Sequence, residues 1–150
     1  KDGYPVTKLP SVNFKSPNEM FMLIEKNDSV LVRQQNSQKE MKTRFSSKKI
    51  LQVGWAENNK HLIMLMRSKA EEKKSNLDES KTLLAIYDLQ KKKTVKMFKT
   101  FGYNRFVLIG DFLIFDNGVG KDSYIEIFKL ESQSNFKTIK INGGCGLRNI

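Results

Sequence analysis

The chain reads IYDLQKKKTVKMF from Ile86 to Phe98. Apolar and polar residues alternate on both sides of a polar, lysine-rich turn, which is the pattern of a strand that reverses into a second, antiparallel strand. Hairpins of this kind recur before and after this stretch. A repeated hairpin predicts stacked antiparallel sheets, and it does not by itself name a chemistry.

Alternation and short apolar runs predict twelve strands that fall into three sets of four. The first set covers residues 12–15, 20–24, 29–34 and 40–45. The second set covers residues 50–55, 61–67, 83–88 and 94–101, and the third covers residues 105–109, 112–115, 124–130 and 136–141. Units of about 40 residues are typical of propeller repeats, so we predict an all-β, propeller-like fold.

A chain of 150 residues is long enough for one domain and too short for two of ordinary size. We predict an N-terminal extension over residues 1–10 and a single all-β repeat domain over residues 11–150, with units at about 11–45, 50–101 and 104–141. Residues 68–80 are polar and carry both signs of charge, so we expect an exposed loop there, with a short helix as the alternative. An antiparallel β-sandwich or barrel is the alternative fold, because alternating strands and polar turns suit it equally.

Three stretches carry a resemblance to a known family. They are Tyr87–Val95, where Asp-Leu precedes a polar turn, and Phe14–Glu19 and Trp55–Lys60, where an aromatic residue precedes a turn. Over roughly residues 11–141 the chain resembles the β-propeller repeats of the WD-repeat and TolB-like type, in which such stretches form the outer and inner hairpins. It departs from that family because it has no Trp-Asp dipeptide, no Gly-His pair and no glycine in the inner-hairpin turns.

The resemblance implies four-stranded blades. Closed propellers typically need about 4–8 blades, whereas the sequence predicts three units. We therefore expect a partial or open array, or a ring that a second copy completes. An open array leaves apolar end sheets uncovered, which favours self-association or a protein partner.

The formal net charge of +11 is concentrated, because residues 91–110 carry 6 basic and no acidic side chains. We call these six residues the basic cluster: Lys91, Lys92, Lys93, Lys96, Lys99 and Arg105. Such a cluster can attract membrane headgroups, a cell-wall polymer or nucleic acid, or it can simply be a solvated turn and strand face. Most of its members are lysine, whereas arginine is the commoner choice for base and bidentate phosphate contacts, so we predict no specific nucleic-acid binding.

Residues that could support catalysis or metal binding are few. The chain has one histidine, His61, and one cysteine, Cys145, which together cannot form a zinc site. A catalytic triad needs a histidine, but His61 stands at the start of the most apolar strand, where a structural role is the simpler interpretation. We predict no catalytic residue, no metal and no cofactor.

Two loop motifs also fail the spacing that their chemistry requires. Residues 118–122 read GVGKD, which lacks the four residues between glycines and the Ser or Thr of a phosphate-binding loop. The acids Asp116, Asp122 and Glu126 lack the alternating carboxylate spacing of a calcium loop. Neither motif changes the prediction of no metal and no cofactor.

Two classes of function remain. We predict a non-catalytic protein- or ligand-binding or scaffold domain, and the alternative is an anion-binding domain that acts through the basic cluster. No apolar run approaches the roughly 20 residues that span a bilayer, so we predict no transmembrane segment. The start at Lys1 rather than Met, the single cysteine and the TolB-like resemblance lead us to expect an extracytoplasmic bacterial domain tethered to the cell surface, as a lipoprotein is.

Overall fold

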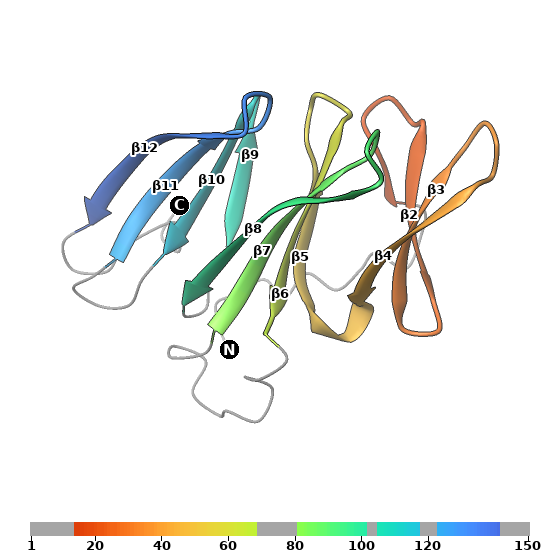
Figure 1. Ribbon diagram of the computed structural model, residues 1–150, viewed down its shortest axis with the longest axis horizontal. Coiled ribbons are helices and arrows are strands. Elements are labelled where there is room, and N and C mark those ends of the chain that lie inside the picture. The colour runs from red at the N-terminus through yellow and green to blue at the C-terminus, as the bar shows by residue number, and fades with distance from the viewer. Residues whose placement is uncertain (1–13, 69–80, 102–104, 118–122, 142–150) are drawn as a thin grey trace.

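The computed structural model describes residues 14–68, 81–101, 105–117 and 123–141 (Figure 1). These residues form three antiparallel sheets of four strands each. Sheet 1 holds β1 (Phe14–Lys15), β2 (Phe21–Lys26), β3 (Ser29–Gln34) and β4 (Glu40–Ser46). Sheet 2, which follows the 3-10 helix η1 (Ser47–Lys49), holds β5 (Ile50–Trp55), β6 (His61–Arg67), β7 (Lys81–Asp88) and β8 (Lys93–Phe101). Sheet 3 holds β9 (Phe106–Ile109), β10 (Phe112–Asn117), β11 (Ser123–Lys129) and β12 (Ser134–Ile141).

Each sheet is a simple meander, because strands that neighbour one another in sequence also pair with one another. The sheets follow one another in chain order (Figure 1), so the fold is neither a two-sheet sandwich nor a barrel. The prediction of an all-β fold with three four-stranded sheets is confirmed. The predicted extension over residues 1–10, the loop from residue 69 onward, the GVGKD stretch and Cys145 lie outside the described residues.

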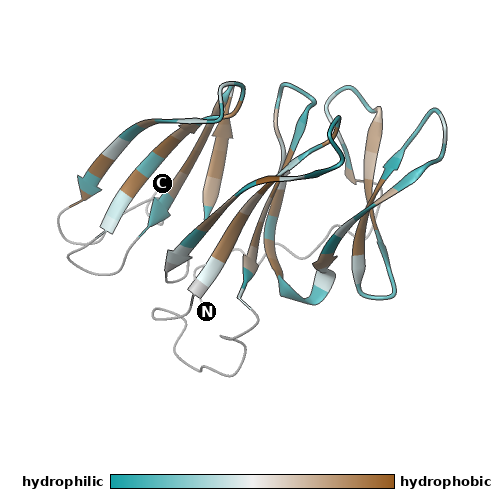
Figure 2. Ribbon diagram, in the orientation of Figure 1, coloured by the Kyte–Doolittle hydropathy of each residue, from teal (hydrophilic) through white to brown (hydrophobic). Residues whose placement is uncertain are grey.

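Sheet 2 is buried on both faces. One hydrophobic cluster fills the space between sheets 1 and 2, and another fills the space between sheets 2 and 3. Strand β6 alternates between them: Leu62 and Met64 belong to the first cluster, Ile63 and Leu65 to the second, and all four are at most 2% exposed. This explains why β6 is continuously apolar rather than alternating, and Figure 2 shows the hydrophobic colour along the strands of this sheet.

Sheets 2 and 3 are also joined by directional contacts. The Gln52 side chain pairs with the main chain of Phe106: its Nε2 donates to the Phe106 carbonyl at 2.8 Å, and the Phe106 N–H donates to its Oε1 at 3.0 Å. Beside it, Gly54 allows a close approach, because a Cβ there would lie 3.1 Å from the Leu108 side chain. These contacts define how sheet 3 is placed against sheet 2.

The inner hairpin turns of sheets 1 and 2 have the same geometry. In each turn an asparagine, Asn18 or Asn58, accepts a hydrogen bond from the main-chain N–H two residues later, at 3.0 and 2.8 Å. The following residue has a positive φ, 61° for Glu19 and 59° for Asn59. This is the turn position at which the propeller family places glycine, so the chain retains the backbone shape without that glycine.

One main-chain hydrogen bond recurs in all three sheets and ties the outer hairpin to the inner one. The donors are the N–H groups of Gln35, Leu89 and Leu130, and the acceptors are the carbonyls of Met20, Lys60 and Asp111, at 2.8, 2.9 and 2.9 Å. This bond and the strand registers define equivalent positions in the three sheets. His61 thus occupies the position that Phe21 holds in sheet 1 and Phe112 holds in sheet 3.

We predict that Glu19→Gly raises the free energy of unfolding by about 0.5–1 kcal/mol, because a left-handed L-residue costs roughly 1–2 kcal/mol and the entropy of an unfolded glycine offsets only part of this. The exposed Lys15–Glu19 ion pair that is lost, at 3.5 Å, contributes little. Urea denaturation followed by circular dichroism measures the change.

Asn59→Gly is the matched control. It relieves a similar backbone conformation but deletes the bond that Asn59 Oδ1 accepts from the Asn18 N–H of sheet 1 at 2.8 Å. We expect this variant to lose stability. A destabilised Glu19→Gly chain would contradict the prediction.

Candidate functional site

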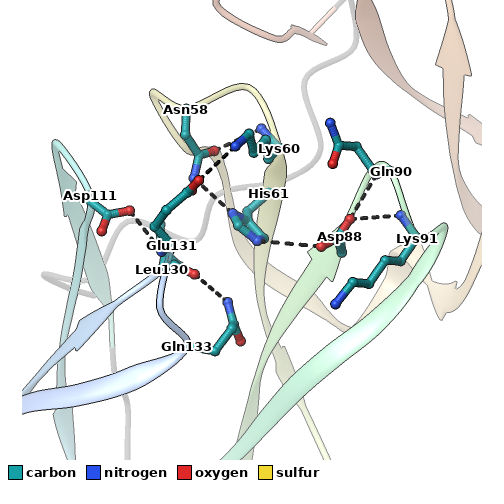
Figure 3. A network of polar contacts seen from close by, with 10 residues as sticks. All are labelled: Asn58, Lys60, His61, Asp88, Gln90, Lys91, Asp111, Leu130, Glu131 and Gln133. Atoms are coloured by element: carbon teal, nitrogen blue, oxygen red, sulfur yellow. Dashed lines mark hydrogen bonds and ion pairs between the residues drawn. The ribbon is translucent and has the colours of Figure 1, made fainter.

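Polar side chains gather where the hairpin turns of sheets 2 and 3 meet (Figure 3). The first and third strands of each sheet run in the same direction, so the turns that follow them lie at one edge of the fold. The network consists of Asn58, Lys60, His61, Asp88, Gln90, Lys91, Asp111, Leu130, Glu131 and Gln133.

His61 lies at the centre of this network and is 5% exposed. The Asn58 Oδ1 accepts a hydrogen bond from the Lys60 N–H at 2.8 Å, so its amide Nδ2 is directed at His61 Nδ1, 2.9 Å away. An amide nitrogen only donates, and the Nδ1 atom must therefore accept. The proton of the neutral ring then resides on Nε2, which lies 3.8 Å from Asp88 Oδ2.

Asp88 holds the outer hairpin turn of sheet 2. Its Oδ1 accepts hydrogen bonds from the main-chain N–H groups of Gln90 and Lys91, at 2.9 and 2.8 Å. The Lys92 N–H donates to the Asp88 carbonyl at 2.8 Å, and Lys92 has a φ of 58°. A short carboxylate side chain that bonds the backbone two and three residues later stabilises such a turn, which explains the aspartate in the Ile86–Phe98 stretch.

Lys60 and Glu131 bridge sheets 2 and 3. The Lys60 Nζ lies 2.7 Å from Glu131 Oε1, and the Glu131 N–H donates to Asp111 Oδ1 at 3.0 Å. The Lys60 ammonium lowers the pKa of Glu131, and the Glu131 carboxylate raises the pKa of Lys60. Because the side chains are 43% and 54% exposed, this ion pair orients the two turns more than it stabilises the fold.

The contacts of this network join the turns of sheets 2 and 3, which is a structural role. Burial lowers the pKa of His61, and the Asp88 carboxylate opposes this shift only in part. The ring is therefore neutral at pH 7, and its two nitrogens face Asn58 and Asp88. In the part of the chain that the structure describes, no group of three or more His, Cys, Asp and Glu residues could hold a metal ion.

We predict that the chain loses stability as the pH falls from 7 to 5. His61 has a lowered pKa in the folded state, so the unfolded state binds more protons once the pH drops below about 6.5, and the free energy of unfolding then decreases. The His61→Phe variant has the phenylalanine that sheets 1 and 3 carry at the equivalent position, and it should lose this part of the pH dependence. Urea midpoints at pH 5, 6 and 7 measure it, and an unchanged pH slope in the variant would show that His61 does not cause it.

The structure places five of the six residues of the basic cluster along one edge of sheet 2. Lys91 and Lys92 lie in the turn after β7, Lys93, Lys96 and Lys99 lie on the edge strand β8, and Arg105 precedes β9. All five lysines are exposed, whereas Arg105 is partly buried.

The cluster does not form one patch. Lys96 pairs across the ladder with Ile86, whose side chain faces sheet 3, whereas Lys99 pairs with Leu83, which packs toward sheet 1. Lys96 Nζ also lies over the Phe98 ring, 5.4 Å from its centroid. Anion binding through the basic cluster stays a prediction.

The sequence analysis did not identify the residues that join the two sheets. Gln52, Asn58 and Glu131 are polar residues in strands and turns, and nothing in their local pattern marks them as partners across an interface. One signal was available for Asn58, because Asn18 occupies the equivalent turn position in sheet 1. Equivalent asparagines in two repeats indicate a shared turn geometry.

No protein-family model matches the chain. No curated protein is similar to it in sequence either. Among solved structures it is similar to the acylaminoacyl peptidase of Pyrococcus horikoshii, with a TM-score of 0.64 and 14% identity over 89% of this chain and 25% of that one. It is also similar to the β-propeller domain of the trilobed protease of Pyrococcus furiosus, with a TM-score of 0.61 and 14% identity over 89% of this chain and 43% of that one.

A third similar structure is dipeptidyl peptidase 4 of Porphyromonas gingivalis, with a TM-score of 0.60 and 9% identity over 87% of this chain and 26% of that one. The chain thus spans between 25% and 43% of the length of these proteins, and identities this low show the fold alone. The described residues have a β-propeller-type fold in which each sheet corresponds to one blade, as the resemblance predicted.

No catalytic domain is evident in the described residues, which form propeller-type sheets. The described segments also contain no helix with the length and apolar character needed to cross a membrane.

Proposed function

We propose that this chain is a non-catalytic binding module, and that its interaction surface is the face of sheet 3 turned away from sheet 2. The partner of this surface is a further four-stranded β-sheet of the same repeat type. The observation that carries the proposal is an apolar face that is half-buried or exposed, whereas the equivalent positions of sheets 1 and 2 are covered by the next sheet.

The strand registers identify this surface. Leu113, Phe115 and Phe128 pack against sheet 2, so their neighbours along β10 and β11 point the opposite way. We call the resulting surface the open face of sheet 3, and its apolar members are Val107, Ile109, Phe112, Ile114, Ile125, Ile127, Phe136, Ile139 and Ile141. The same registers place three charged residues on it: Asp116, Lys129 and Lys137. Three of its apolar members are exposed: Ile109 and Phe136 at 58% and Ile139 at 38%.

The equivalent positions of sheets 1 and 2 show what normally covers this face. Leu23 in sheet 1 and Ile63 in sheet 2 correspond to Ile114, and they are 5% and 0% exposed because the next sheet packs on them. Val32 and Ile86 correspond to Ile127, and both are 0% exposed. The same rows of aliphatic side chains recur on sheet 3, which supports a sheet as the occupant rather than a helix or a loop.

The charges of sheet 1 argue against a head-to-tail stack of identical copies. Its face turned away from sheet 2 carries five charged residues on β2, β3 and β4: Lys26, Arg33, Glu40, Lys42 and Arg44. Burying these groups against the isoleucines of sheet 3 would cost free energy that no partner charge offsets. The open face of sheet 3 therefore suits a more apolar sheet face than the outer face of sheet 1.

In a solution of the chain alone, we expect the open faces of two copies to cover each other. Sedimentation velocity should show a concentration-dependent dimer. Ile139→Lys and Phe136→Lys, each at an exposed residue of the open face, should return the chain to a monomer without loss of stability, because a buried lysine disfavours the contact.

Met97→Lys is the matched control, since Met97 is 43% exposed on the outer strand of sheet 2, away from this surface. It should leave the dimer unchanged. A chain that stays monomeric at every concentration, or a Met97→Lys variant that dissociates equally, would refute the proposed interaction surface.

A further inference from the structure

We propose that a groove on sheet 1 binds a small ligand that carries an anionic group on an apolar body. The groove has a volume of about 430 Å³ and lies over β3, β4 and the turn between β2 and β3. Volumes of roughly 300–1,000 Å³ are typical of small-molecule sites. Its charged wall consists of Lys26, Glu40, Lys42 and Arg44, and the aliphatic stems of these side chains together with Leu31 form its apolar part. Val30 also borders the groove, although its side chain is 0% exposed and packs between sheets 1 and 2.

The only carboxylate of this wall among the described residues is already neutralised. Glu40 accepts hydrogen bonds from Lys26 Nζ at 3.0 and 3.1 Å and from Arg33 Nη2 at 2.8 Å. Arg33 and, to a lesser extent, Lys26 lower the pKa of Glu40, so the carboxylate stays ionised and shared between two cations. It is therefore not available to compensate the other positive charges of the groove.

Two cations remain for a ligand. The described residues provide no ion-pair partner for Lys42 or Arg44. Both side chains are exposed and alternate along β4, so they project from the same face of sheet 1. Together with Lys26, Arg33 and Glu40 they give this surface a net charge of +3, from four cations and one anion. A carboxylate or a phosphate is the complementary group.

The backbone at Arg44 favours a role for its side chain. Arg44 has a φ of 69°, where an L-residue is disfavoured and glycine is the natural choice. It lies in a β-bulge of the β3–β4 ladder, in which the Thr43 Oγ1 donates to the Val30 carbonyl at 2.8 Å. The bulge holds Arg44 in this disfavoured conformation while its side chain lines the groove.

The test uses sodium octanoate, which combines a carboxylate with an apolar chain, and inorganic phosphate, which lacks the apolar part. In amide NMR titrations of the whole chain, octanoate should shift the signals of Val30, Leu31 and Lys42 in a saturable way. Phosphate should shift the same signals with a weaker affinity. Arg44→Gly should weaken octanoate binding by about tenfold or more, because one charged hydrogen bond is lost.

Lys140→Ala is the control, since it also removes one exposed cation but lies on β12 of sheet 3, outside both the groove and the basic cluster. It should leave octanoate binding unchanged. The proposal is overturned if both variants lose octanoate binding equally or if the signals do not saturate. It is also overturned if the shifts are confined to the open face of sheet 3, or if phosphate binds as tightly as octanoate. Because this groove and the open face of sheet 3 lie on different sheets, the dimer experiment and this titration fail independently.

Discussion

The fold depends on burying aliphatic side chains between neighbouring sheets. Sheet 2 is apolar on both faces, and its residues Ile63 and Met64 are 0% exposed because sheets 3 and 1 cover them. A four-stranded meander with two apolar faces cannot be stable alone in water, since each buried aliphatic side chain contributes roughly 1.5–3 kcal/mol only when its face is covered. Stacking is therefore a condition of folding, and the polar contacts act on sheets that are already stacked.

Directional contacts at the edges of these interfaces decide the relative placement of the sheets. Gln52 bonds the main chain of Phe106 in both directions, and Lys60 reaches Glu131 at the turn edge. His61 stands where the other two sheets have phenylalanine, and its ring forms a hydrogen bond with Asn58 at the same edge. Apolar packing tolerates sliding, whereas a two-way amide contact does not, so these residues select one arrangement.

The two outermost faces of the stack differ in chemistry, and the proposed functions follow from that difference. Sheet 3 presents isoleucines at positions that are buried elsewhere in the repeat, whereas sheet 1 presents Lys42 and Arg44 beside a groove. An apolar face is complementary to another sheet, and a cationic groove is complementary to a small anion. The similar peptidase structures share the fold at 9–14% identity, so the function of this chain has to be inferred from its own surfaces.

The amino-acid sequence alone determined the number of strands, their grouping by fours and the turn chemistry, because alternation and turn residues are local properties. Asp88 in the Ile86–Phe98 stretch is an example, since its carboxylate bonds the backbone two and three residues later. The tertiary structure alone decided which faces are covered, because that depends on residues far apart in sequence. It also decided which sheet each lysine of β8 faces: the pleat places Lys96 and Lys99 on opposite faces, and only the stacking shows that these faces belong to sheets 3 and 1.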